Sequence, residues 1–176
     1  MARIYAAKGR PSFNPLIVHV ADVNAARAIA DMTPQAEAET DPAAAGRMMR
    51  ANYLGPALLL GRVAARMATR GRGTIVGISS VAGDRGRASN YVYGSAKAGF
   101  TAFLSGLRAR MARDGVRVIT VKPGFVRTRM TEGMKLPGAL TAEPEEVARA
   151  VCFLSGPDAE FVTGATLDVS GGWMMS

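Results

Sequence analysis

The stretch that decides the fold is Gly73-Thr-Ile-Val-Gly-Ile-Ser-Ser-Val-Ala-Gly83, followed after a short loop by Tyr91-Val-Tyr-Gly-Ser-Ala-Lys97. The first part is apolar and bounded by glycines, which predicts a strand, and the second begins a run with apolar residues at helical spacing. Ser80 ends the strand. Tyr93 and Lys97 lie four residues apart, which places them on one face of the helix. The pattern therefore gathers a hydroxyl, a phenol and an ammonium where a strand leads into a helix.

These three side chains suit the reduction of a ketone. A hydroxyl can hold the carbonyl oxygen, a phenol can give that oxygen a proton, and an ammonium can make the phenol more acidic. A free phenol has a pKa near ~10, and we expect the cation of Lys97 to bring the pKa of Tyr93 toward neutrality. Tyr91 is a poorer candidate for the acid because its i+4 neighbour is Ser95.

Further motifs resemble those of the short-chain dehydrogenase/reductase family. Asn52 matches the asparagine that precedes the serine strand in that family, and Lys122-Pro-Gly-Phe-Val-Arg-Thr128 matches its Pro-Gly turn followed by a threonine. Thr163-Gly-Ala-Thr-Leu-Asp-Val-Ser-Gly-Gly172 resembles its closing strand with paired glycines. Together with the serine, tyrosine and lysine above, the resemblance covers about residues 41–174.

The resemblance implies an α/β fold, a Rossmann-like doubly wound parallel sheet with helices on both faces, in a single domain over residues 1–176. It implies an oxidoreductase that transfers a hydride between NADP(H), or NAD(H), and a small-molecule carbonyl or secondary alcohol. The implied catalytic residues are Asn52, Ser80, Tyr93 and Lys97. The implied cofactor contacts are Asp22, Tyr93, Lys97, Pro123, Gly124, Val126 and Thr128. Asn52 would fix a water that passes protons to Lys97.

The front of the chain departs from the family. Its glycine-rich dinucleotide turn, Gly-x-x-x-Gly-x-Gly, does not occur, and only 40 residues precede Asp41. We therefore expect an N-terminally shortened chain whose sheet is incomplete in its first half. Ala2–Ala7 predicts a short strand. Leu16–Val20 resembles the family's third strand, with Asp22 after it beside the adenine, or alternatively the fourth strand.

Charge and composition narrow the class of function. The net charge is +8, but the basic residues are dispersed and are not interleaved with aromatic residues, which argues against nucleic-acid binding. Positive potential instead favours an anionic cofactor or a phosphorylated substrate. Lys8 and Arg10 follow the first expected strand and favour NADP. No apolar run is long enough for a membrane span or a signal peptide, so we expect a cytoplasmic protein.

Two residue types that often carry chemistry have structural interpretations here. His19 is the single histidine and lies in an apolar run, so neither a metal site nor histidine-dependent nucleophilic catalysis is predicted. Cys152 is the single cysteine and has apolar neighbours at helical spacing, which predicts a core residue. Ser79, one residue before the strand end, is expected to pack.

The remaining elements alternate as a parallel sheet with crossover helices requires. The pattern predicts helices over 41–69 and 91–113, strands over 74–79 and 116–121, and a last helix that begins at Glu143 and ends before Gly156. Family members pair the two long helices between subunits, so the resemblance implies a homodimer or homotetramer.

The substrate stays open at this stage. Residues 129–140 correspond to the mobile lid of the family, and their apolar side chains suit a bulky substrate or simple packing of the lid. The segment 80–94 resembles the branch that reduces keto-sugars carried on polyprenyl phosphate, whereas the ending, 161–172, resembles oxoacyl reductases. Two other functions compete with the reductase: a relative deficient in cofactor binding that acts as an inert or assembly-only module, and, least favoured, a basic nucleic-acid-binding protein.

Overall fold

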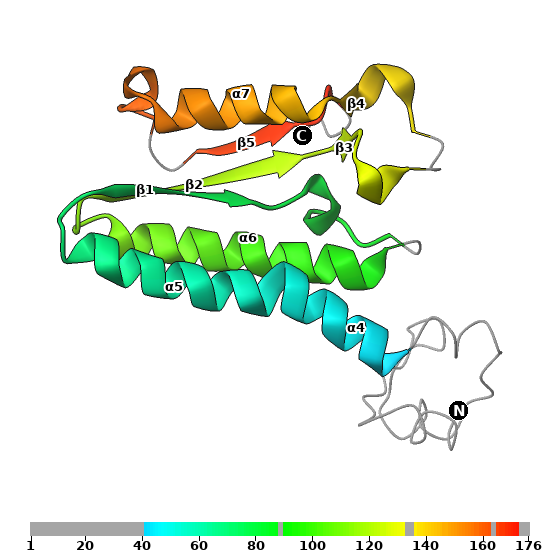
Figure 1. The fold of residues 1–176 in the computed structure, drawn as a ribbon, viewed down its shortest axis with the longest axis horizontal. Helices are drawn as coiled ribbons and strands as arrows, with labels where there is room; N and C mark the ends of the chain where they lie inside the picture. Colours follow the sequence, from blue (N-terminus) through cyan, green and yellow to red (C-terminus); the bar gives the residue numbers. More distant parts are fainter. Residues whose placement is uncertain (1–40, 88–89, 133–135, 163–164, 173–176) are drawn as a thin grey trace, which may run out of the picture. The chain divides into compact units, whose positions relative to one another are not determined.

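The computed structural model describes residues 41–176 except 88–89, 133–135, 163–164 and 173–176 (Figure 1). The expectations for the two early strands and for Lys8, Arg10, His19 and Asp22 therefore lie outside the described residues. Residues 43–176 form one compact unit. A single domain over the whole chain stays a prediction.

The centre of the fold is a parallel sheet. It contains β1 (Gly73–Ile78), β2 (Val116–Pro123) and β5 (Thr166–Val169), in the order β1-β2-β5. β2 is the middle strand of the three, and its residues pair in parallel register with both neighbours. A second, two-stranded parallel pair joins β3 (Phe125–Val126) to β4 (Thr141–Ala142). Both expected central strands are confirmed within one or two residues of the predicted ends.

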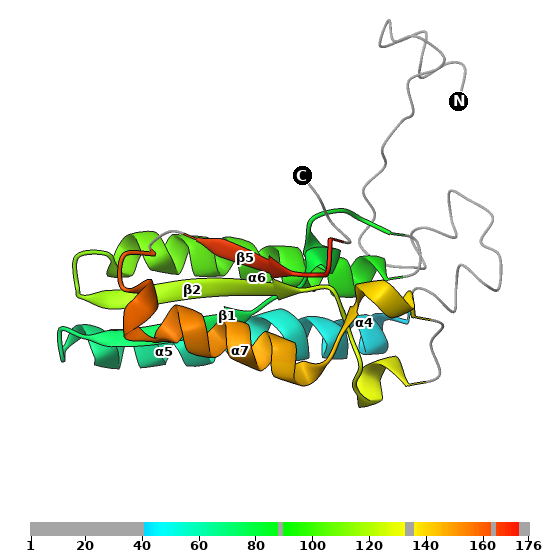
Figure 2. The ribbon, with the colours of Figure 1, turned by 90° about the horizontal axis from the view of Figure 1, so that it is seen from above.

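Helices cover both faces of the sheet, which confirms the predicted α/β architecture. α4 (Pro42–Met49) continues through a π-helical turn, Arg50–Leu54, into α5 (Gly55–Ala68). Together with α6 (Tyr91–Met111), α5 lies on one side of the strands, and α7 (Pro144–Ser155) lies on the other (Figures 1 and 2). None of the helices in the described part of the chain is both long and apolar enough to cross a membrane.

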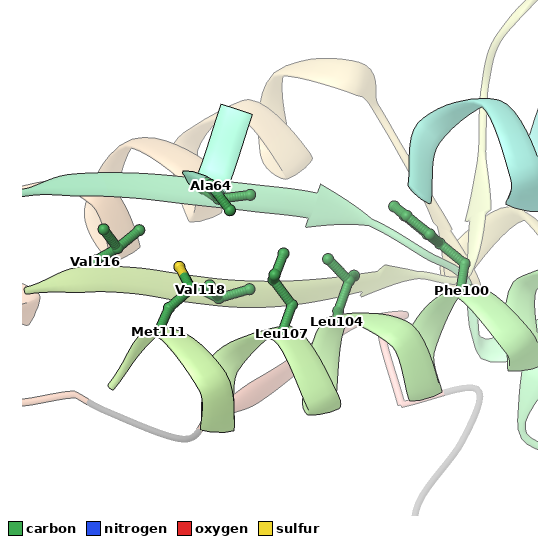
Figure 3. Close-up of a cluster of buried hydrophobic side chains, with 8 residues drawn as sticks. Ala64, Phe100, Leu104, Leu107, Met111, Val116 and Val118 are labelled. Carbon is green, nitrogen blue, oxygen red and sulfur yellow. The ribbon is translucent and has the colours of Figure 1, made fainter. Parts of the chain in front are cut away.

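The larger core cluster lies between the sheet and the helices α5 and α6 (Figure 3). Its buried members are Ala64, Ile75, Phe100, Leu104, Leu107, Met111, Val116 and Val118. The α6 members recur at three- and four-residue intervals, so one stripe of the helix faces the strands. This stripe fixes the rotation of α6 about its axis, and with it the direction in which the polar residues of its first turns point.

The second cluster lies on the α7 side of the sheet. Ile119 and Val121 of β2 pack there with Leu154 and Ala159. β2 therefore alternates between two buried faces, as expected for a central parallel strand. Arg117 binds the C-terminal end of α7. Its guanidinium donates hydrogen bonds to the carbonyl oxygens of Ser155 at 3.1 Å and Ala159 at 3.0 Å.

α7 begins where the sequence predicts, but one of its residues, Cys152, differs from the prediction. Glu143 and Glu146 form a reciprocal capping box at its start. Cys152, however, is exposed, so its prediction as a core residue is wrong. The inward stripe of α7 runs through Val147, Val151 and Leu154, and the helical period turns position 152 away from that stripe.

Candidate active site

Ser80 stands at the carboxyl end of β1, where the chain turns into a short 3-10 turn, Val81–Gly83. Its backbone is extended, and its hydroxyl oxygen accepts a hydrogen bond from the Ala82 amide at 3.1 Å. The same hydroxyl donates over 3.4 Å to the carbonyl oxygen of Pro123, at the end of β2. Ser80 is 7% exposed, so these bonds hold its side chain in a buried, defined position.

Two glycines let the turn after Ser80 lie directly on α6. A Cβ atom at Gly94 would lie 2.7 Å from the carbonyl oxygen of Ala82, and one at Gly83 would lie 2.7 Å from the amide nitrogen of Ala98. Both distances are shorter than any real Cβ contact, so only glycine permits this approach. The close packing places the end of β1 beside the first turns of α6.

That approach brings Tyr93 and Lys97 next to Ser80. The Ser80 hydroxyl lies close enough to the Tyr93 phenol to lower the pKa of that phenol. The Lys97 ammonium lies 5.7 Å from the centroid of the Tyr93 ring and donates to the carbonyl oxygen of Ile78 at 3.2 Å. The side chains of Ser80, Tyr93 and Lys97, which the sequence predicted to lie together, therefore meet between the end of β1 and the start of α6.

The pKa of the Tyr93 phenol differs from the prediction. Burial raises the pKa of Tyr93, and the hydrogen bond with Ser80 offsets only part of that effect. Burial also lowers the pKa of Lys97. The predicted shift of the Tyr93 pKa toward neutrality is therefore wrong for the protein without ligands. The reason is that removal from water disfavours the charged form of both groups, and this is the largest effect on each pKa.

A cavity of about 450 Å³ opens beside these residues. Its lining includes these predicted site residues: Ser80, Tyr93, Lys97, Pro123, Gly124, Val126 and Thr128. They come from three segments of the chain, namely the end of β1, the start of α6 and the turn after β2. The parallel sheet brings them together because the carboxyl ends of its strands meet at one edge.

Asn52 is not among the residues that line this cavity. Its side-chain amide donates to the carbonyl oxygen of Met48 at 3.2 Å, one turn earlier in the same helix. Asn52 lies within the π-helical turn, Arg50–Leu54, and Met48 itself does line the cavity. Single π-helical turns are frequent at functional sites, so the turn that contains Asn52 is the structural feature that favours a functional role for this residue.

Ser79 has a structural environment, in agreement with the sequence. Its hydroxyl donates to the backbone oxygen of Lys97 at 3.0 Å and shares a hydrogen bond of 2.6 Å with the Thr101 hydroxyl. The side chain therefore fastens the end of β1 to α6, and its hydroxyl is occupied by these bonds.

The turn after β2 is held by the last strand and by its own caps. The Gly124 amide donates to the carbonyl oxygen of Val169 at 2.9 Å. Thr128 and Thr131 form a reciprocal capping box at the 3-10 turn that follows. Arg127 pairs with Glu143 at 2.8 Å, which joins the turn to the start of α7. Of the expected lid, Leu136 and Leu140 are partly buried, and part of the remaining segment lies outside the described residues.

One ionic cluster near the site was missed by sequence reasoning. The Lys122 ammonium lies 2.8 Å from a carboxylate oxygen of Asp84 and 3.1 Å from one of Asp168. Burial alone would lower the pKa of Lys122, but the hydrogen bonds and negative charges of the two aspartates raise it. The cluster ties the loop after Ser80 to the two strands β2 and β5.

Sequence reasoning also missed several cavity-lining residues. Arg87, Asn90 and Phe125 share the lining with the residues named above. Arg87 and Asn90 belong to the short loop before α6. An asparagine directly before a helix suggests a cap, and only the three-dimensional position shows that it borders the cavity.

Comparisons with known proteins agree with this geometry. A family model described as enoyl-(acyl carrier protein) reductase matches residues 17–174. An uncharacterised oxidoreductase of Mycobacterium tuberculosis is 52% identical over 116 residues, which are 66% of this chain and 46% of that protein. The acetoacetyl-CoA reductase of Allochromatium vinosum is 40% identical over 119 residues, 62% of this chain and 48% of that protein.

Among solved structures, a gluconate 5-dehydrogenase from Burkholderia cenocepacia, in complex with NADP and tartrate, superposes with a TM-score of 0.68 at 26% identity. The match covers 75% of this chain and 56% of that protein. The chain spans about half the length of the curated relatives it matches. Its motifs, its parallel sheet and these similarities together show that the chain belongs to the short-chain dehydrogenase/reductase family.

Proposed function

We propose that this protein is an oxidoreductase that transfers a hydride between a nicotinamide dinucleotide and a carbonyl or secondary alcohol. The observation that carries the proposal is the meeting of Ser80, Tyr93 and Lys97 at one cavity, whose lining includes all three side chains. The relatives with printed activities, among them acetoacetyl-CoA reductase, support the same class of reaction.

The residues around the cavity fit the nicotinamide half of such a cofactor. Arg87 and Lys97 are the charged residues in the described lining, and both are cationic, which suits an anionic dinucleotide. The Lys97 ammonium and the Thr128 hydroxyl would hold ribose or phosphate oxygens, and the backbone from Pro123 to Val126 would contact the carboxamide. Asp22 would lie beside the adenine. The neighbour solved with NADP favours NADP(H) over NAD(H).

Proton transfer follows from the positions of the side chains. When bound, the reduced cofactor supplies a hydride to the carbonyl carbon. Tyr93 donates its phenolic proton to the carbonyl oxygen, and its raised pKa keeps that proton available at neutral pH. Ser80 hydrogen-bonds the same oxygen. The Lys97 ammonium stabilises the resulting phenolate and returns a proton to it, and Asn52 holds a water that supplies Lys97.

The substrate class and the assembly state are proposed from two further observations. The acetoacetyl-CoA reductase supports a 3-oxoacyl type of ketone, one of the two classes that the sequence left open. For assembly, Leu58 and Leu59 of α5 are each 62% exposed, an apolar surface that suits a second copy of the chain in a homodimer or homotetramer. Sedimentation at micromolar concentration tests the assembly, and a stable monomer would contradict it.

The reaction is tested with the full chain, NADPH or NADH, and acetoacetyl-CoA. We expect cofactor binding at millimolar concentration or below, measured by fluorescence, and turnover that Tyr93→Phe lowers by roughly 10²- to 10⁴-fold. Tyr91→Phe is the matched control, since Tyr91 is exposed and does not line the cavity. Equal losses in the two variants would refute the role of Tyr93. Absence of cofactor binding would refute the oxidoreductase proposal for this chain.

A further inference from the structure

Lys122 lies near the end of β2, directly before Pro123, which borders the cavity. Side chains alternate along a strand, so Lys122 is on the face of β2 whose valines belong to the larger core cluster beneath α6. Its ammonium lies 2.8 Å from a carboxylate oxygen of Asp84 and 3.1 Å from one of Asp168. Only 13% of the Lys122 side chain is exposed, so the two carboxylates replace most of the water around its charge.

Asp84 stands at the end of the tight turn that begins at Ser80. The Gly83 amide donates to the carbonyl oxygen of Ser80 at 3.1 Å, and the Asp84 amide donates to the carbonyl oxygen of Val81 at 3.1 Å. These bonds close the turn on itself. The position of the Asp84 carboxylate is therefore coupled to the position of Ser80.

Two contacts join this turn to the end of β2. The Ser80 hydroxyl donates to the carbonyl oxygen of Pro123 over 3.4 Å, which is long for a hydrogen bond, whereas Lys122 binds Asp84 through a charged one of 2.8 Å. The serine has a single proton to donate, so it must leave Pro123 when it binds a substrate carbonyl. The contact between Lys122 and Asp84 then remains, because neither is among the described residues that line the cavity.

The other side of the ionic cluster has an anchor of its own. Lys122 and Asp168 are neighbours in the parallel register of β2 and β5, and the Gly124 amide donates to the carbonyl oxygen of Val169 at 2.9 Å. The turn after β2 therefore stays attached to β5 when Lys122 is replaced. The loss of the ammonium is felt mainly by the turn that begins at Ser80.

We propose that Lys122 is a positioning residue for the reaction: through Asp84, it holds Ser80 at the place where the serine hydroxyl binds the carbonyl oxygen of the substrate. Asp168 orients the ammonium toward Asp84. This inference rests on the proposed function and adds to it a residue outside the cavity lining. Because Ser80 contacts only the reacting carbonyl group, the role of Lys122 is the same for a 3-oxoacyl chain as for other ketones.

The effect on rate should exceed the effect on stability. Partly exposed ion pairs contribute little to stability, whereas misplacement of a reacting group by about 1 Å can cost about 10²-fold in rate. Removal of a hydrogen-bond donor to a developing oxyanion costs roughly 10²- to 10³-fold in kcat. A residue that only positions the Ser80 hydroxyl should account for a part of that loss, and should have no effect on rate once the hydroxyl is absent.

A double-mutant cycle measures whether Lys122 acts through Ser80. The full chain is assayed with NADPH and acetoacetyl-CoA as wild type, Ser80→Ala, Lys122→Met and the double variant. We expect Lys122→Met to lower kcat/KM roughly 10-fold when Ser80 is present and at most about twofold when it is absent. The loss should lie in kcat, with the KM for NADPH within about threefold of wild type. A ratio of the two effects of at least about threefold supports the inference; a smaller ratio, or a loss confined to the KM for NADPH, overturns it.

A second variant and a control accompany the cycle. Asp84→Ala breaks the same contact while Lys122 keeps Asp168, and it replaces Lys122→Met, with the same criteria, if that variant does not fold. Arg149→Met is the matched control, because it removes another cation from an ion pair, the one with Glu146 on α7 at 4.0 Å. We expect it to leave kcat/KM within about twofold of wild type. Coupling to Ser80 in this control equal to that of Lys122→Met overturns the inference.

The titration of Tyr93 tests the inference without turnover. Ser80 lowers the pKa of Tyr93, so Ser80→Ala should raise the midpoint of the tyrosinate absorbance that Tyr93→Phe removes. Lys122→Met should raise this midpoint as well, and the rise should shrink by at least about half in the Ser80→Ala background, since a direct effect of the lost charge does not depend on the serine. If no ketone is turned over, the proposed reaction fails, and this titration decides. No rise in Lys122→Met, or a smaller decrease, overturns the inference.

Discussion

Replacing Gly94 with alanine tests how the site is assembled. The added methyl would lie 2.7 Å from the carbonyl oxygen of Ala82, whereas ordinary contacts begin at 3.4 Å. The turn and the helix must therefore separate by the difference, about 0.7 Å. That separation moves Ser80, which precedes the turn, away from Tyr93, which precedes Gly94.

The size of the effect follows from this displacement. Overpacking of this kind costs about 1–3 kcal/mol, and the better helix propensity of alanine returns about 0.5–1 kcal/mol. We expect the free energy of unfolding to fall by about 0.5–2 kcal/mol. Because misplacement of reacting groups by about 1 Å can cost 10²-fold in rate, we expect roughly a 10- to 100-fold loss of kcat/KM.

Gly106→Ala on the same helix is the matched control. A Cβ atom at Gly106 would meet nothing within 4 Å, so this variant should gain about 0.5–1 kcal/mol from helix propensity alone. Both variants are unfolded with urea and followed by circular dichroism, and kcat/KM is measured with the ketone that wild type reduces. If Gly94→Ala is as stable and as active as Gly106→Ala, the close packing of the turn on α6 does not position Ser80.

Three further predictions concern ionisable groups. Lys122→Met leaves Asp84 and Asp168 without their cation. Both carboxylates are about a third exposed and stay partly hydrated, so urea unfolding should show a loss of about 1 kcal/mol that shrinks at high salt; an unchanged midpoint would contradict this. Burial raises the pKa of Tyr93, so the tyrosinate absorbance lost in Tyr93→Phe should titrate above pH ~10, and a midpoint below that value would refute the shift. Between pH ~10 and the folded pKa, Tyr93 is protonated in the folded protein but ionised in the unfolded chain. The free energy of unfolding should therefore fall as the pH rises through this range. Cys152 is exposed, so thiol reagents should modify it in the native protein; reaction only after unfolding would show that it is buried.

Local patterns in the sequence were sufficient for the elements and for most of the site. Phe100, Leu104 and Leu107 recur at helical spacing, and this stripe alone predicts α6 and its inward face. Tyr93 and Lys97 are one helical turn apart, so their proximity needs no knowledge of the tertiary fold. The strand and the helix that position the three central side chains are adjacent in the chain.

What the sequence did not predict depends on tertiary structure. Lys122 meets Asp168 because β2 and β5 pair in a particular parallel register, which no local pattern specifies. The direction of the Tyr93 pKa shift depends on how much water the fold removes from the phenol. Cys152 was misassigned because apolar neighbours along the chain do not show which side of α7 faces the sheet.

The strand β5 supplies the final anchors of the site, through Asp168 to Lys122 and through Val169 to Gly124. During synthesis, the serine, tyrosine and lysine leave the ribosome well before these residues do. A nascent chain can therefore form its long helices around a β1–β2 pair while the turn that borders the cavity is still unanchored. The anchoring of this turn therefore depends on β5, which is translated after the serine, the tyrosine and the lysine.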